Sequence, residues 1–142
     1  MLDSFNLAAA NASYEHYFSF FTPDAVFLGT DATEHWTRDS FKVWAKPWFD
    51  KGKAWSFHTV DRYVYTGKYA DMAWFDELLD AGKARIYRGS GVVVKSGGQW
   101  KIQQYVLSMT MPNAVSKAAT EVKSMIEDSL LIQLKHKDKV NN

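Results

Sequence analysis

Cysteine is absent from this sequence of 142 residues. Its absence excludes disulfide bonds, catalysis by a thiolate and metal sites with cysteine ligands. It also fits a cytoplasmic protein, and the N-terminus lacks the basic and then apolar segment that directs export. No stretch approaches the roughly 20 apolar residues that a membrane-spanning helix requires. We therefore expect a cytoplasmic protein with no membrane partner.

An excess of charge of either sign is also missing. Seventeen Lys and Arg residues are balanced by sixteen Asp and Glu residues, which gives a formal net charge of +1. Nucleic acids and anionic membranes are bound by basic surfaces, so neither is an expected partner. His16 and His136 fall in predicted helices without an acidic partner at ligand spacing, and we predict no metal site.

Aromatic residues, by contrast, are abundant. Six Trp, seven Tyr and nine Phe make up 15% of the chain. Such side chains suit a bulky core or the wall of an apolar pocket. The hydrophobic share of 46% and the charged share of 23% are ordinary for a globular protein. The length fits one domain that can bury a core without disulfide bonds or structural metal ions.

Helices are predicted near both ends of the chain, from apolar residues that recur at helical spacing. Capping residues, a Thr-Pro-Asp stop and a late proline set their limits. The predicted elements outside the central part of the chain are a helix from Asp3 or Ser4 to about residue 20, a short strand 25–28, a polar loop 30–37, a second helix 38–49, a last helix from 114 to about 134, and a polar tail 135–142 that is expected to fray.

Four strands occupy the central part of the chain, at residues 55–66, 71–79, 85–95 and 100–111. Short polar or glycine-bearing turns separate them and are hairpin signals. The strands should therefore form an antiparallel meander. The predicted fold class is α+β, with helices packed on a single curved sheet.

Two adjacent carboxylates, Asp76 and Glu77, lie in the middle of the strand 71–79. Successive side chains of a strand point to opposite faces, so one acid faces inward. Two-residue turns would put Asp76 opposite Tyr87, on a face that glycines make concave. Glu77 would then pair with Arg88 on the other face. This favours Asp76 as a pocket acid, although a one-residue bulge in either hairpin would reverse the two faces.

The chain resembles a known family in the order of its elements and in four segments. These are YFSFFTPDAVFLGTD (17–31), EHW (34–36), AWFDELLD (73–80) and RGSGVVVKSGGQWKIQQYVLS (88–108). Over about residues 5–113 the chain is similar to the SnoaL-like branch of the nuclear transport factor 2-like superfamily, which has many uncharacterised bacterial members. On this basis residues 1–113 form a SnoaL-like domain, and residues 114–142 form a C-terminal helix and frayed tail.

The resemblance implies a cone-shaped fold. N-terminal helices pack in a strongly curved antiparallel sheet, which leaves a deep apolar pocket at its open end. Members usually form homodimers through the outer face of the sheet, where the predicted faces place the apolar residues Val92, Tyr105 and Leu107. A homodimer is therefore an expected assembly.

Two functional classes stay open, because relatives include steroid isomerases, dehydratases, polyketide cyclases and non-catalytic association domains. The first is a domain that binds a small apolar molecule. The second is a cofactor-independent isomerase, dehydratase or cyclase that uses Asp76 as acid or base on a hydrophobic carbonyl substrate. Gly29 stands where the isomerases have a general-base Asp, which favours the binding domain.

Candidate site residues follow from the predicted faces and from the resemblance. The candidate catalytic residues are Asp76, His58 as the histidine of a dehydratase, and Tyr14 as the tyrosine of an isomerase, with Tyr17 as an alternative to Tyr14. The candidate ligand-binding residues are Trp36, Trp48, Trp55, Trp74, Tyr87, Trp100 and Gln104.

Overall fold

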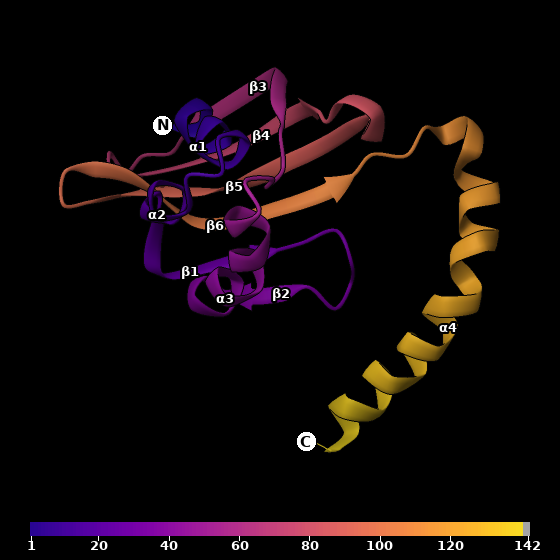
Figure 1. Cartoon of the computed structure of the whole chain (residues 1–142). Helices are drawn as coiled ribbons and strands as arrows, with labels where there is room; N and C mark the ends of the chain where they lie inside the picture. The colour runs from indigo at the N-terminus through magenta and orange to yellow at the C-terminus, as the bar shows by residue number, and fades with distance from the viewer. Residues whose placement is uncertain (141–142) are drawn as a thin grey trace. The chain divides into compact units, whose positions relative to one another are not determined.

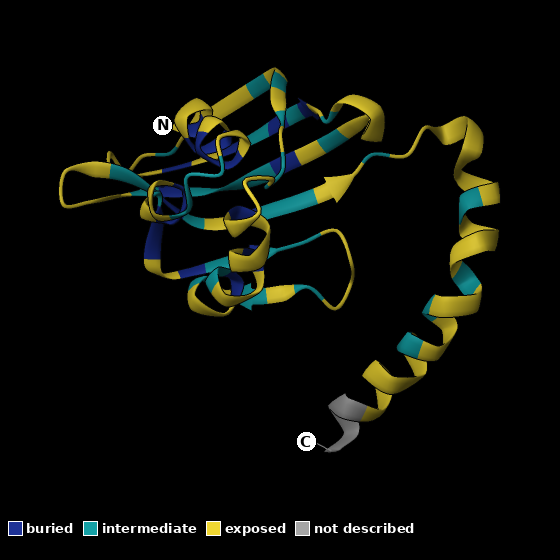
Figure 2. Cartoon of the chain, in the orientation of Figure 1, coloured by how far each residue is buried: buried dark blue, intermediate teal, exposed yellow. Residues whose placement is uncertain are grey.

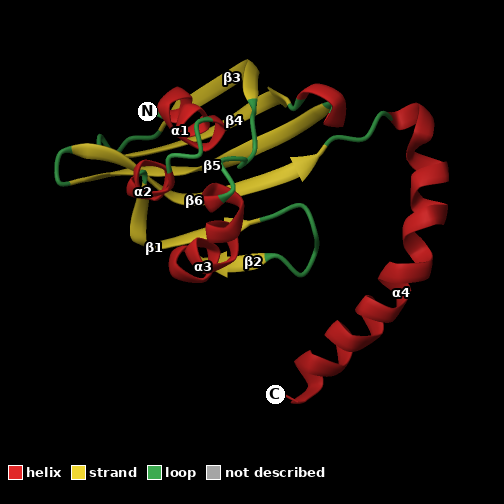
Figure 3. Ribbon diagram, viewed as in Figure 1, coloured by secondary structure: helices red, strands yellow, loops and turns green. Residues whose placement is uncertain are grey.

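The computed structural model describes residues 1–140, and the chain divides into two units, Met1–Thr110 and a second that begins at Met111. The first unit combines helices with a six-stranded sheet (Figures 1 and 3). Its helices are α1 (Leu2–Ala10), α2 (Tyr14–Ser19) and α3 (Arg38–Asp50). Its strands are β1 (Phe21–Leu28), β2 (His35–Thr37), β3 (His58–Thr66), β4 (Met72–Asp80), β5 (Ile86–Ser96) and β6 (Gln99–Met109).

The strand order in the sheet is β2-β1-β6-β5-β4-β3. Strands β3 to β6 form the antiparallel meander that the turn residues predict. Strand β1 joins this meander in parallel with β6, and β2 pairs antiparallel with β1. The predicted α+β class, with helices packed in a curved sheet, is confirmed.

The core lies between the helices and one face of the sheet. Along β4, residues Ala73, Phe75, Glu77 and Leu79 are buried and alternate with more exposed ones, as a half-covered strand requires (Figure 2). Phe5 of α1 packs on this inner face, with its ring centroid 5.4 Å from that of Tyr105 in β6. Helix α3 packs against β1 and β2 (Figure 1).

The N-terminal segment differs from the single long helix that the apolar spacing predicts. Helices α1 and α2 are separated at residues 11–13, where Ala12 has a φ of 51°. A left-handed residue of this kind ends a helix, because its carbonyl no longer points along the axis. Strand β1 begins at Phe21 and includes Pro23, which the sheet accommodates where the register with β6 is interrupted.

The predicted polar loop 30–37 also contains structure. Its last three residues form β2, whose residue Trp36 lies opposite Phe27 of β1. The remaining residues, 29–34, form the loop that joins the two strands. This short hairpin brings the loop and Trp36 to the end of the sheet next to α3.

The second unit contains a short 3-10 turn, Asn113–Val115, followed by helix α4, Ser116–Val140. The helix extends beyond residue 134, where the apolar stripe suggests an end. Residues 141–142 of the predicted tail lie outside the described residues. No helix within residues 1–140 is both long and apolar enough to cross a membrane.

Candidate functional site

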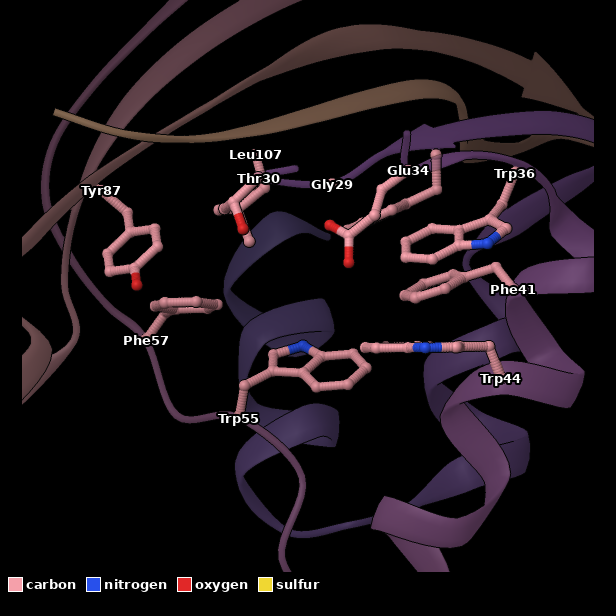
Figure 4. A pocket seen from close by; sticks show the side chains of 11 residues that line it. Gly29, Thr30, Glu34, Trp36, Phe41, Trp44, Trp55, Phe57, Tyr87 and Leu107 are labelled. Atoms are coloured by element: carbon pink, nitrogen blue, oxygen red, sulfur yellow. The ribbon is translucent and has the colours of Figure 1, made fainter. Parts of the chain in front are cut away.

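An aromatic cavity of about 200 Å³ opens at the end of the sheet where β1 and β2 meet α3. Seven of its eleven lining residues are aromatic, so its walls offer mainly apolar surface. Figure 4 shows the lining side chains converging on one space. The lining residues are Phe27, Gly29, Thr30, Glu34, Trp36, Phe41, Trp44, Trp55, Phe57, Tyr87 and Leu107.

Helix α3 supplies one wall of the cavity. Phe41 and Trp44 are three residues apart and therefore lie on one side of the helix. Trp36 of β2 lies close to both, with ring centroids 5.5 Å from Phe41 and 4.8 Å from Trp44. Trp55, in the segment before β3, completes this group at 5.8 Å from Phe41. The helix is anchored at its start because the Thr37 hydroxyl accepts a hydrogen bond from the Ser40 N–H.

Glu34 is the one charged side chain among the eleven lining residues. Its Oε2 accepts a hydrogen bond from the backbone N–H of Asp31 at 3.1 Å, which fixes the carboxylate inside the loop 29–34. The Gly29 N–H donates to the Glu34 carbonyl at 2.9 Å. A Cβ atom on Gly29 would lie 2.1 Å from Glu34 Oε2, so the carboxylate fills the space that a side chain at position 29 would need.

Three of the predicted ligand-binding residues line this cavity: Trp36, Trp55 and Tyr87. Trp48 lies one turn beyond Trp44 on α3 and borders an adjoining shallow hollow of about 120 Å³. Trp48 therefore lies close to the cavity but does not line it.

The other predicted ligand-binding residues lie elsewhere. Trp74 is on the outer face of the sheet, stacked on Tyr65 with centroids 5.9 Å apart. Trp100 borders a separate surface hollow near α2, with the Lys95 ammonium 5.3 Å from its ring centroid. Gln104 is exposed. The prediction that Trp74, Trp100 and Gln104 line the pocket is wrong. Trp74 and Gln104 face outward, Trp74 because of the register of the β4–β5 hairpin and Gln104 because of a bulge in the pairing of β5 with β6. Trp100 packs against the core but lies away from the cavity.

The connection between β4 and β5 has five residues rather than two. Asp80 pairs with Ile86, and the intervening residues include the 3-10 turn Gly82–Ala84. Asp76 consequently pairs with Ser90, and it is Leu79 that lies opposite Tyr87. The pairing of β4 with β5 is thus shifted by three residues from the predicted one. Because three is an odd number, this shift exchanges the two faces of the strand.

Asp76 therefore points away from the cavity. Its Oδ2 accepts a hydrogen bond from the Tyr65 hydroxyl at 3.0 Å on the outer face. This bond raises the pKa of the Tyr65 phenol above its ordinary value. The prediction that Asp76 is the pocket acid is wrong, and its inferred catalytic role loses its geometric basis.

Glu77 is the acid that faces inward, and it is 1% exposed. Its Oε2 lies 2.6 Å from Nη2 and 2.8 Å from Nε of Arg62, so the predicted partner Arg88 is replaced by Arg62 of β3. Tyr105 donates its hydroxyl to Glu77 Oε1 at 3.0 Å. Burial, and then the charge of Glu77, raise the pKa of Tyr105 well above its ordinary value. This satisfied ion pair belongs to the core and does not line the cavity.

The remaining candidate catalytic residues also lie outside the cavity. His58, at the start of β3, is exposed and borders a hollow beside α1. Tyr14 donates its hydroxyl to the Lys42 carbonyl at 3.0 Å, and its pKa is raised by burial and by Glu15. The structure does not bring Asp76, His58 and Tyr14 together.

Glu34 is the residue that sequence reasoning missed. The sequence offered one signal, the glycine at position 29 followed five residues later by an acid in the EHW segment. Only the folded hairpin shows that this acid occupies the space beside the glycine.

A family model described as a SnoaL-like domain matches residues 1–112. The chain belongs to the SnoaL-like domain family. The match spans the whole first unit of this SnoaL-like protein and confirms the superfamily that the sequence motifs suggest. A comparison with proteins of curated function gave no match.

Solved structures of similar fold share low sequence identity with this chain. A domain of unknown function with a cystatin-like fold from Nostoc punctiforme has a TM-score of 0.68 and 15% identity, over 99% of this chain and 93% of that one. An NTF2-like protein of unknown function from Pseudomonas putida has a TM-score of 0.65 and 12% identity, over 79% and 83%. A protein provisionally named scytalone dehydratase from Novosphingobium aromaticivorans has a TM-score of 0.63 and 18% identity, over 78% and 79%. At these identities the likeness shows the fold.

Proposed function

We propose that this SnoaL-like protein binds a small, largely apolar molecule in the cavity between α3 and the β1–β2 hairpin. The observation that supports the proposal is the predominance of aromatic rings in a cavity with a single charged side chain, Glu34. Apolar walls with a few placed polar groups are typical of ligand sites. A cavity of roughly 150 Å³ accepts benzene, so a volume of about 200 Å³ suits a ligand of about one ring.

Binding is tested by tryptophan fluorescence and thermal shift with a panel of one-ring and branched aliphatic molecules. Trp44→Ala should abolish the response, because Trp44 forms part of the wall. Trp74→Ala is a matched control, since the two indoles are equally exposed, at 43% and 44%, and Trp74 lies on the outer face. If no molecule raises the melting temperature or changes the fluorescence, the protein is not a binding protein for this class of ligand.

The second candidate function is cofactor-independent proton transfer, and the place of Glu34 favours it. The steroid isomerases of this superfamily have a general-base Asp at the position of Gly29. Here the Glu34 carboxylate occupies the space beside that glycine, where it faces the cavity. A carboxylate in an apolar cavity is suited to remove a proton next to a carbonyl group.

Proton transfer is tested by deuterium exchange at the carbons next to the carbonyl of 2-indanone, followed by NMR in D₂O. We expect exchange to depend on Glu34 and to be lost in Glu34→Gln. The Asp76→Asn variant should catalyse exchange of the probe at the wild-type rate, because Asp76 lies on the outer face. Exchange that is no faster than in buffer rules out this activity for the probe.

A homodimer through the outer face of the sheet is also part of the proposal. Tyr63, Tyr65 and Trp74 lie on this face and are 56%, 42% and 44% exposed. Exposed aromatic patches of this kind are typical of association sites. Of the residues predicted for this interface, Val92 is on the same face as Trp74, but Tyr105 is buried on the inner face and Leu107 lines the cavity.

A further inference from the structure

We infer that the ligand of this cavity carries a positive charge, in a quaternary or protonated ammonium group held by Glu34 and the surrounding indole rings. The inference rests on the proposed binding function and specifies the chemical class of the ligand. It is drawn from the charge of the cavity and from the type of its rings.

The fixed charge of the cavity has one sign. Glu34 contributes a carboxylate, and none of the eleven lining residues is Lys, Arg or His. No ion pair among the described side chains involves Glu34. Its Oε2 is held by the Asp31 N–H, while no hydrogen bond to Oε1 is found among the described residues. Among the described residues, the carboxylate therefore lacks a counter-charge, and a cationic ligand would supply it.

The aromatic walls favour the same charge. The face of an aromatic ring carries negative charge density and attracts a cation, and Trp is the strongest of the three ring types. Trp36, Trp44 and Trp55 all line the cavity. In Figure 4 the Glu34 carboxylate points into the space bordered by the rings of Trp44 and Trp55. A group that is apolar on its surface and positive overall would satisfy both the rings and the carboxylate.

An anionic ligand meets the opposite conditions. It would approach the Glu34 carboxylate inside an apolar cavity, where screening by solvent is weaker than in water. The side-chain donors in the lining are the hydroxyls of Thr30 and Tyr87 and the indole N–H groups of the tryptophans. These neutral donors do not supply the counter-charge that a buried carboxylate or phosphate needs.

Three probes of nearly the same shape separate the charge of the ligand from its size. They are choline, its neutral carbon analogue 3,3-dimethylbutan-1-ol, and the anion 3,3-dimethylbutanoate. Each presents the same three-methyl head group, which is small enough for a cavity of about 200 Å³. Affinity is measured by isothermal titration calorimetry on the full-length protein. The indole N–H signals in NMR show which tryptophans respond.

We expect choline to bind at least about tenfold more tightly than the neutral alcohol, since cation–π contacts and a carboxylate both favour it. The anion should not bind detectably. The indole signals of Trp36, Trp44 and Trp55 should shift on addition of choline, and those of Trp74 and Trp100 should not, because they lie outside the cavity.

Glu34→Gln tests the role of the carboxylate while keeping an oxygen that can accept from Asp31. This substitution should lower the affinity for choline at least about fivefold and leave the affinity for the neutral alcohol unchanged within about twofold. Glu15→Gln is the matched control, because it removes one negative charge from α2 at an exposed site outside the cavity. It should change neither affinity.

The outcomes distinguish the charge of the ligand from the existence of the site. If the alcohol or the anion binds as tightly as choline with the same indole shifts, the cavity is a binding site but the inferred charge is wrong. If Glu34→Gln and Glu15→Gln lower the affinity for choline equally, the attraction is a general surface effect and the inference also fails. If none of the probes binds, the charge inference and the proposed site are both overturned for head groups of this size.

Discussion

A buried carboxylate requires compensation, and Glu77 obtains it from Arg62 and Tyr105. The guanidinium also donates to Asp3 Oδ1 at 2.7 Å and to Thr59 Oγ1 at 2.8 Å. Burial lowers the pKa of Arg62, but the bonds to Asp3 and Glu77 outweigh it and raise the pKa above its ordinary value. The network links α1, β3, β4 and β6, and its contribution is measurable.

Removal of the cation alone should be costly. We expect Arg62→Ala to lower the free energy of unfolding by about 3–5 kcal/mol, because it leaves Glu77 charged and buried without a partner. Urea unfolding measures this change. The double variant Arg62→Met with Glu77→Leu should recover most of the loss, since it removes both charges. A loss below about 1 kcal/mol in the single variant would contradict the assigned role of the pair.

Two buried phenols give the protein an alkaline limit. Burial raises the pKa of Tyr17 and of Tyr105 well above the ordinary value of 10.0. In the unfolded chain these groups lose their protons near pH 10, whereas the folded protein retains them. Their contribution to stability is therefore complete below that pH and is lost progressively as the pH rises above it.

The urea concentration at the midpoint of unfolding should accordingly decrease as the pH is raised from about 9.5 to 11. Tyr17→Phe should make this fall less steep, because phenylalanine cannot ionise. Tyr69→Phe is the control, because Tyr69 is 69% exposed. A slope that is the same in Tyr17→Phe and the wild type would mean that Tyr17 does not limit alkaline stability.

At the scale of the elements, strand β5 depends on two glycines that face the core. A Cβ atom on Gly91 would lie 2.2 Å from the carbonyl oxygen of Gln104, and one on Gly89 would lie 2.2 Å from the Tyr105 hydroxyl. The neighbouring strand and side chains approach β5 closely because these positions have no side chain.

Gly91→Ala should lower the free energy of unfolding by about 1–3 kcal/mol, since the backbone of β6 must move to admit the methyl group. Thermal unfolding measures the loss. Ser90→Ala is the control in the same strand, because Ser90 points to the opposite face. Equal stability of the Gly91 variant and the wild type would mean that the two strands separate without cost.

The hairpin between β4 and β5 shows how far the sequence predicts this fold. Apolar alternation and turn residues predict all four strands of the meander within a few residues of their observed ends. They do not predict that residues 81–85 form a five-residue connection with a 3-10 turn. Strand assignment tolerates an error of a few residues, but face assignment depends on whether the loop count is odd or even.

The candidate site was less predictable than the fold for a related reason. Trp36 and Trp55 line the cavity as predicted because aromatic residues suit the wall of an apolar pocket. Tyr87 lines it because alternation within strand β5 places it on the same face as Gly89 and Gly91, whatever the register with β4. Glu34 lies in a loop without periodicity, and its position depends on the glycine at 29 and on the closure of the β1–β2 hairpin. Such tertiary contacts leave no local pattern.

At the scale of the whole molecule, the outer face of the sheet sets the expected assembly. Trp74→Glu would place a charge in the aromatic patch of Tyr63, Tyr65 and Trp74, and should shift a dimer toward monomer by burying an unpaired carboxylate. Light scattering coupled to size exclusion measures the mass. Val43→Glu, at a residue of α3 that is 77% exposed, is the control. A wild-type protein that is monomeric at all concentrations would contradict the proposed interface.

The parallel pairing of β1 with β6 has a consequence for the time course of folding. Phe27 pairs with Tyr105, so this contact closes a loop of most of the first unit, whereas β3 to β6 join through local hairpins. Long loops slow the formation of the contacts that close them. Pulse-labelled hydrogen exchange should therefore protect β4 and β5 before β1, and simultaneous protection would contradict this order. The cavity needs residues from Phe27 to Leu107, so a ribosome-bound chain cannot hold a ligand there until nearly the whole domain has been synthesised.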